Sequence, residues 1–282
     1  MNRDSLRASM STLVANALPK NAKRFRFSFF DDQPSHNALG MRVDPQPIEG
    51  KIIAHAEDAF IVKPDRATFV AVDRALATLC PALGDKVRVT PYCCRNFAGE
   101  RLDAPREEQQ ETIDGHPYIV KKILIGGSPL HIPLPTEPHC QYLTDMVQQL
   151  ELLPTPDRMR TIVNMLVDAK AKEIEIVDPD DKNLFKTPPE ISFAVDTSKF
   201  TGRIAVIYDR GLDLYVVELR VAGKVLNRIE EVDVTSLAEV MTDLIDDGQW
   251  RRIRVEILGS ATTPAARSRN RREQRESVAE MS

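Results

Sequence analysis

The chain opens with apolar residues at helical spacing and continues with short runs in which apolar and polar residues alternate. The first pattern predicts an amphipathic helix that ends near Pro19 and docks its apolar stripe on its own domain; the stripe is Leu6, Met10, Leu13, Ala17 and Leu18. From Arg24 the alternating runs include RFRFSFF, KIIAH, AFIVK, TFVAV and KVRV. Short strands at such regular intervals, with little helix between them, predict a small, mostly-β, barrel-like module over residues 1–135.

The second half of the chain mixes the two periodicities. A proline-rich segment, GGSPLHIPLPTEPHC, predicts the domain boundary because proline suits neither a helix interior nor a central strand. Thr155, Pro156 and Asp157 then have the order of a helix start, and a helix capped by Ser236 is expected later. The runs ISFAVD, RIAVIYD and LYVVELRV, this later helix and RRIRVEIL predict a βββαβ order. We therefore expect an α+β module over residues 136–258 and a disordered basic tail over residues 259–282.

Composition narrows the functional classes. The 282 residues carry a formal net charge of −4, so the whole molecule is not a polyanion-binding protein by charge alone, and nucleic-acid binding requires a local basic patch. The N-terminal region lacks the apolar core of a signal peptide, and no run is long enough to span a bilayer. These features predict a cytoplasmic protein whose four cysteines are reduced thiols.

Familiar catalytic and cofactor motifs are missing from the sequence. It contains no GxxxxGK[ST], GxGxxG, GxSxG or HExxH pattern, which argues against the usual nucleotide sites and hydrolase arrangements. Cys93, Cys94, His139 and Cys140 lack the spacing of a zinc site. We therefore predict no cofactor and no metal, and in the leading hypothesis the protein is not an enzyme.

Arginines supply the positive signal for binding. They occur on the last predicted strand and, more densely, in the tail; the candidate nucleic-acid-binding residues are Arg252, Arg254, Arg267, Arg269, Arg271, Arg272 and Arg275. A basic arm of this kind makes salt-sensitive contacts with phosphates regardless of base sequence. On the strand, Arg252 and Arg254 share one face, while Ile253, Val255 and Ile257 are expected to point into the core. The alternative is a solvated tail whose charge is partly neutralised by Glu273 and Glu276.

One stretch of the first module resembles a known family. Residues 50–92 have the order "GK-I…, FIVKPDRATFVAVDRALA…, ALGDKVRV…Y", with Asp73-Arg74 and Gly84-Asp85 as its most specific positions. This order resembles the KfrB-type domain found in proteins of plasmids and integrative elements. The resemblance implies a setting in mobile-element biology and brings no catalytic residues with it.

A second resemblance concerns residues 191–258. Asp196 ends the first strand of the βββαβ order, Glu256 lies on the strand after the helix, and Thr201-Gly202 forms a small-residue turn between the first two strands. This layout resembles a degenerate RNase H-like fold of the RuvC type, which implies a divalent-metal site. Asp196 and Glu256 are then the catalytic candidates and Mg²⁺ the alternative cofactor, although such sites need a third carboxylate that the sequence does not supply.

These patterns leave three functional hypotheses. The leading one is a non-enzymatic cytoplasmic accessory protein that binds nucleic acid or a protein partner, in plasmid or mobile-element biology. The first alternative is a metal-dependent nuclease of RNase H-like fold. The second is a structural module that self-associates or assembles with a protein partner through its N-terminal helix and barrel. No membrane partner is expected.

Overall fold

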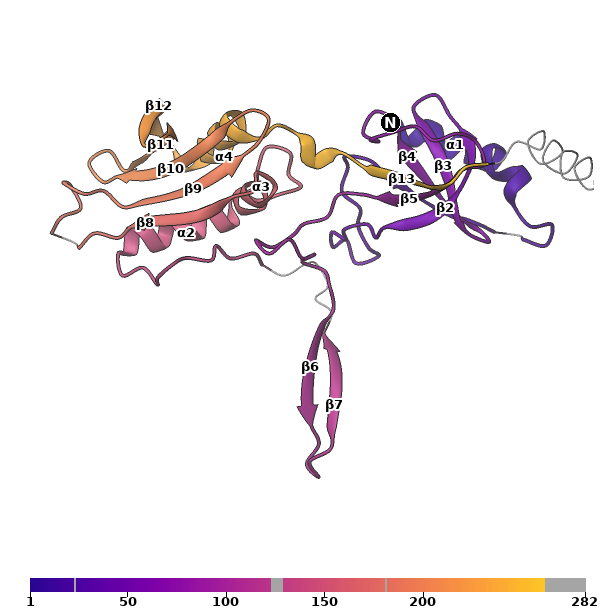
Figure 1. The fold of residues 1–282 in the computed structure, drawn as a ribbon, viewed down its shortest axis with the longest axis horizontal. Helices are drawn as coiled ribbons and strands as arrows, with labels where there is room; N and C mark the ends of the chain where they lie inside the picture. The colour runs from indigo at the N-terminus through magenta and orange to yellow at the C-terminus, as the bar shows by residue number, and fades with distance from the viewer. Residues whose placement is uncertain (23, 123–128, 181, 262–282) are drawn as a thin grey trace, which may run out of the picture. The chain divides into compact units, whose positions relative to one another are not determined.

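A computed structural model describes residues 1–22, 24–122, 129–180 and 182–261 (Figure 1). The mixed α+β class with a predominance of strands is confirmed. The chain divides into two compact units. Among the described residues, the first unit contains 1–32, 45–92 and 251–261, and the second contains 33–44 and 93–250. No described helix is both long and apolar enough to cross a membrane. Residues 262–282, which include five of the arginines singled out above, lie outside the described part.

The first unit is built on one six-stranded sheet in the order β1-β4-β3-β2-β5-β13. Its strands are β1 (Arg26–Phe30), β2 (Ile48–His55), β3 (Ala59–Asp65), β4 (Thr68–Asp73), β5 (Lys86–Thr90) and β13 (Arg254–Gly259). Neighbouring strands are antiparallel except β1 and β4, which are parallel. Because β1 and β13 remain as two edges, the sheet is open, and the closed barrel suggested by the strand spacing does not form.

Both faces of this sheet carry apolar residues over part of their area. On one face a core forms around Phe60, Val62 and Val70. On the other, α1 (Arg3–Val14) packs its apolar stripe against alternate residues of β3 and β4, which include Ile61 and Phe69. The helix therefore docks on its own domain, as its spacing predicts.

The last strand joins a different sheet from the one that the sequence predicts. β13 pairs with β5, with Val255 opposite Val89, and Ile253 and Val255 are buried in the core of the first unit. The predicted boundaries at residues 135 and 258 therefore differ from the observed division, in which residues from both ends of the chain build one unit. The strand also continues to Gly259, one residue into the segment expected to be tail.

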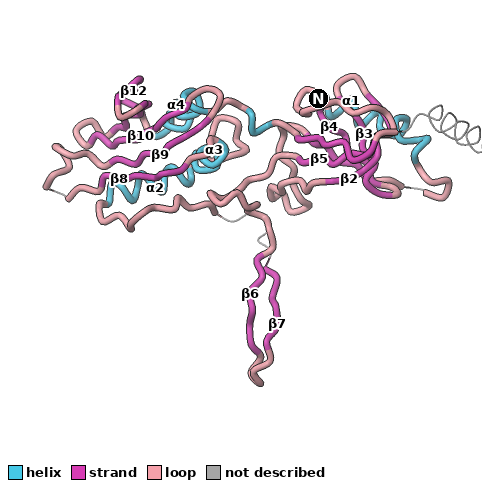
Figure 2. The backbone as a smooth tube through the Cα atoms, viewed as in Figure 1, coloured by secondary structure: helices cyan, strands magenta, loops and turns pink. Residues whose placement is uncertain are grey.

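The second unit is an antiparallel five-stranded sheet with helices packed on it (Figure 2). The strand order is β12-β11-β10-β9-β8, so each strand pairs with its neighbour in the chain. The strands are β8 (Lys172–Val177), β9 (Glu190–Asp196), β10 (Thr201–Asp209), β11 (Leu214–Val221) and β12 (Lys224–Val232). The helices α2 (Gln141–Leu152), α3 (Ile162–Asp168) and α4 (Val234–Ile245) share one apolar core with the sheet. From β9 onward the chain forms four strands before α4, where the sequence predicts three, because β12 is not among the predicted strands.

The start of α3 also differs from the prediction. Thr161 caps this helix, and its hydroxyl and backbone amide contact the side chain of Asn164. The segment that contains Thr155 and Asp157 forms a turn before the helix, in which Asp157 accepts hydrogen bonds from the amides of Met159 and Arg160. The threonine–proline–aspartate order therefore marks a turn, and the true cap lies six residues later.

Two short loops of the second unit repeat one another in sequence and in structure. They read SHNALGMRVD (residues 35–44) and CRNFAGERLD (residues 94–103). In each, the asparagine side chain accepts two backbone amides and a glycine adopts a left-handed conformation; these residues are Asn37, Asn96, Gly40 and Gly99. The loops also meet, because Asp44 accepts the amide of Cys94. A third turn of similar form connects β6 (Arg106–Glu111) and β7 (Pro117–Lys122), which pair only with each other within the described part of the chain.

Candidate nucleic-acid interface

The face of the first sheet that α1 partly covers carries polar side chains over β2, β5 and β13. Val87 and Val89 of β5 point into the core on the opposite face, so the residues that alternate with them point away from that core. Charged residues occupy these alternate positions on all three strands; they are Glu49, Lys51, Lys86, Arg88, Arg254 and Glu256. This surface, together with Lys63 of β3, is termed the basic face.

Three lysines lie directly opposite one another across the basic face. Lys51 of β2 pairs with Lys63 of β3 on one side and with Lys86 of β5 on the other. Like charges in directly opposite positions destabilise a sheet. Adjacent strands lie only about 4.8 Å apart, so this lysine row concentrates positive charge within roughly 10 Å. A row that opposes folding stability in this way is typical of a functional surface.

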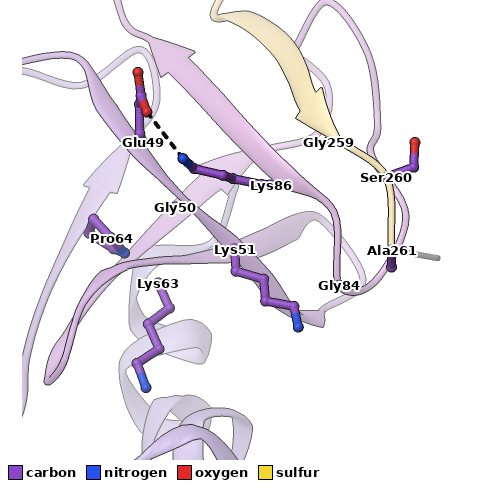
Figure 3. Close-up of a pocket in the computed structure, with 10 residues that line it drawn as sticks. All are labelled: Glu49, Gly50, Lys51, Lys63, Pro64, Gly84, Lys86, Gly259, Ser260 and Ala261. Carbon is purple, nitrogen blue, oxygen red and sulfur yellow. Dashed lines mark ion pairs between the residues drawn. The ribbon is translucent and has the colours of Figure 1, made fainter.

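The three amino groups differ in their contacts, and Figure 3 marks the ion pair of one of them, Lys86, with Glu49. Lys63 donates to the carbonyl oxygen of Ala17 at 2.5 Å, so it fixes the turn after α1. Lys86 approaches the carboxylate of Glu49 at 3.7 Å. Within the described residues, no ion pair or hydrogen bond involves the amine of Lys51, whose stem passes beside Gly84. Lys51 is therefore the cation of the row that is available to an external anion.

A second row of charges lies beside the lysines. Arg88 donates from Nε and Nη2 to one oxygen of Glu49, at 3.0 and 2.6 Å, and also approaches Glu256 at 3.7 Å. The hydrogen bond from Arg88 is the main cause that lowers the pKa of Glu49 below its ordinary value. Glu256 also pairs with Arg254 at 2.6 Å. The basic face thus has five cationic and two anionic side chains, in a chain whose overall charge is negative.

An open groove of about 700 Å³ runs along the lysine row. All of its lining residues belong to the first unit; they are Glu49, Gly50, Lys51, Lys63, Pro64, Gly84, Lys86, Gly259, Ser260 and Ala261. The amide of Ala261 donates to Asp85 at 3.0 Å, which holds the end of the described chain in the groove. The arginine-rich segment follows Ala261 in the sequence, so the last described residues of the groove directly precede it in the chain.

Gly50 permits the close approach of strands on which the lysine row depends. A Cβ atom added at this position meets the carbonyl oxygen of Lys63 at 2.6 Å and other backbone atoms of β3 within 2.8 Å. We expect Gly50→Ala to lower the free energy of unfolding by about 1–3 kcal/mol, because backbone must move to admit the methyl group. Urea denaturation measures the loss. Gly259→Ala is the matched control, since a Cβ atom there meets nothing within 4 Å; equal stability of the two variants would contradict the prediction.

The two carboxylates proposed for a nuclease site do not lie on neighbouring strands. Asp196 ends β9 in the second unit, where Lys170 holds it at 2.9 Å and lowers its pKa. Glu256 lies on β13 in the sheet of the first unit. Strand β13 follows α4 in the chain but pairs with β5, so the βββαβ arrangement that would place the two side chains in one sheet is absent. No group of three or more metal-ligating side chains occurs among the described residues.

The predicted arginines are placed only in part. Arg252 is exposed just before β13, and Arg254 is exposed on it. Ile253 and Val255 point into the core as expected, but Ile257 is 48% exposed near the end of this edge strand. The remaining five, Arg267, Arg269, Arg271, Arg272 and Arg275, lie outside the described residues.

Sequence reasoning missed the lysine row. The sequence predicts the separate strands and contains a lysine in each, but it does not show which residues lie opposite each other on neighbouring strands. Comparison with known proteins does not add a family to this geometry: no family model, no curated protein and no solved structure matches the chain.

Proposed function

We propose that this protein is a non-enzymatic, cytoplasmic accessory protein that binds the phosphate backbone of nucleic acid through its basic face and its arginine-rich C-terminal segment. The observation that carries the proposal is the register of Lys63, Lys51 and Lys86 across three adjacent strands. Direct opposition of like charges lowers sheet stability, and a bound polyanion relieves that repulsion. The resemblance of residues 50–92 to KfrB-type domains is our reason for proposing a setting in mobile-element biology.

Binding of this kind depends on phosphates rather than bases. The basic face presents flexible lysines and arginines and, within its described residues, no aromatic side chain in the groove for a base to stack on. Each phosphate neutralised by a cation releases counterions, so affinity falls steeply with salt. The protein is thus proposed to bind with little regard to sequence, and its selectivity arises from the local density of phosphates.

The test replaces the two lysines of the row that do not support α1. We expect Lys51→Ala/Lys86→Ala to weaken binding of a fluorescently labelled single-stranded DNA about tenfold or more at about 50 mM salt. The slope of log affinity against log salt should fall by about 1.4, which is two contacts at about 0.7 each. Fluorescence anisotropy across a salt series measures both quantities, and a duplex of the same sequence shows which form is preferred.

The control variant removes the same charge elsewhere. Lys20 and Lys224 are exposed and lie outside the basic face, so Lys20→Ala/Lys224→Ala changes net charge equally and should leave affinity within about twofold. Equal losses in the two double variants, or no binding by the unaltered chain even at low salt, would rule out the basic face as a nucleic-acid site.

A further inference from the structure

Glu49 occupies a distinctive place on the basic face. It lies on β2 between the cations of the row and those of the next row, two residues before Lys51. One of its oxygens accepts two hydrogen bonds from Arg88, and the other lies 3.7 Å from Lys86. The carboxylate therefore engages both cations that β5 contributes to this face, while Lys51 has no such partner among the described residues.

A phosphate group can make the same contacts. Carboxylate and phosphate oxygens accept the same forked hydrogen bonds from a guanidinium group and the same ion pair from an amine. All three side chains are exposed to solvent, with 43% of Glu49, 62% of Lys86 and 48% of Arg88 accessible. Ion pairs between exposed side chains are weak and exchange readily, so a phosphate can replace the carboxylate of Glu49 as the partner of these cations.

We propose that Glu49 is an internal competitor, whose carboxylate holds Lys86 and Arg88 in the free protein and is displaced by a phosphate of the bound nucleic-acid strand. This inference rests on the proposed function and adds a determinant of selectivity to it. A single phosphate that displaces Glu49 gains little, because it exchanges one anion for another and leaves the displaced carboxylate nearby. A strand whose neighbouring phosphates also contact Lys51 gains further ion pairs, so the competitor favours contiguous phosphates over isolated ones.

The contrasting role for Glu49 is purely structural. A carboxylate among five cations reduces their mutual repulsion, and its loss then lowers stability without improving binding. The two roles predict opposite results for nucleic-acid affinity, because an internal competitor weakens binding and a structural counter-ion supports the surface that binds. Affinity, rather than stability, therefore decides between them.

The experiment neutralises Glu49 in the full chain. For Glu49→Gln we expect the affinity for labelled single-stranded DNA to rise about 3–10-fold at about 50 mM salt, with a salt slope steeper by about 0.7–1.4, because one or two more cations become available to phosphates. Glu57→Gln is the matched control: Glu57 is exposed in the turn between β2 and β3, outside the groove, and its change in charge is the same. That control should bind within about twofold of the unaltered chain.

Two outcomes separate this inference from the function on which it rests. If Lys51→Ala/Lys86→Ala weakens binding but Glu49→Gln matches Glu57→Gln or binds more weakly, the competitor role is wrong and the basic face still binds nucleic acid. If the lysine variant equals its own control, the proposed function fails at this face, and the competitor role fails with it. Inorganic phosphate, added as a competitor of labelled DNA, is a second probe. If phosphate displaced DNA from the unaltered chain about tenfold more effectively than from the Glu49→Gln variant, the preference for contiguous phosphates would be contradicted.

Discussion

Deletion of residues 262–282 from a chain that also carries Lys51→Ala and Lys86→Ala is expected to reduce nucleic-acid binding below detection. Either change alone should weaken binding by at least tenfold. The described chain ends in the groove at Ala261, and the arginine-rich segment follows it in the sequence. If both cationic elements bind one strand, as proposed, their linkage in one chain gives a high effective concentration, which raises overall affinity by about 10²–10⁴ over either element alone.

The loss of affinity in each single variant tests whether the two elements bind the same strand. If the basic face and the C-terminal segment bind the same strand, removing either one removes the gain from effective concentration, and each single variant loses substantially. If only one of the two elements binds nucleic acid, its loss alone abolishes binding, and loss of the other element leaves affinity within about twofold. Fluorescence anisotropy with the four proteins distinguishes these cases. A chain in which the five tail arginines are replaced by serine, at unchanged length, separates the effect of charge from that of truncation.

The nature of the lysine row explains why the sequence predicts one half of the proposed interface and not the other. A cluster such as RSRNRREQR is visible because its charges are adjacent in the chain. Lys63 and Lys86 lie 12 and 35 positions after Lys51 in the chain, and only strand pairing brings the three together. Alternation predicts which face of its own strand each lysine takes, but register between strands depends on the whole fold. Both the strand order β3-β2-β5 and the register of its pairs are needed to predict the row.

The same limit accounts for the misplaced strand. The run RRIRVEIL was correctly predicted as a strand with Ile253 and Val255 facing a core. Its assignment to the preceding sheet followed from the tendency of consecutive elements to be neighbours, which holds in roughly two-thirds of cases. Here the chain instead returns to β5, 164 residues back from Arg254 to Thr90, and contributes the edge strand of the first unit. The local pattern therefore predicts the strand. Long-range pairing determines the domain boundary and places Glu256 in a different sheet from Asp196.

Arg160 illustrates a residue whose importance only the tertiary structure reveals, and its replacement should have the largest effect on stability. Its side chain is completely buried in the second unit, where it contacts Asp157 at 2.9 Å, Asp168 at 3.0 Å and Asp246, and lies 3.9 Å from the ring centre of Trp250. Burial opposes its charge, but the three carboxylates outweigh burial and hold the pKa of Arg160 above its ordinary value. We expect Arg160→Ala to lower the free energy of unfolding by about 3–5 kcal/mol, because three carboxylates are left together without a cation.

The loss should also depend on pH in a definite direction. Burial raises the pKa of Asp157, but Arg160 and the surrounding hydrogen bonds overcome it, so the folded pKa lies below the ordinary value of 3.8. The stability that this carboxylate contributes is therefore complete above that ordinary value and is lost as pH falls through the lower, folded pKa. In Arg160→Ala the cation is gone, and burial then favours the protonated carboxyl of Asp157, so the deficit relative to the unaltered chain should shrink from pH 7 towards pH 4.

Urea denaturation followed by circular dichroism at these two pH values measures the effect. Arg210→Ala is the control: that arginine is exposed and stacks over Tyr142 and Phe185 of the same unit, so its loss should cost less than about 1 kcal/mol at either pH. A deficit for Arg160→Ala as small as that of the control would show that the buried cluster does not stabilise the second unit. A large deficit of equal size at both pH values would instead assign the loss to packing against Trp250, since only the electrostatic contribution titrates with the carboxylates.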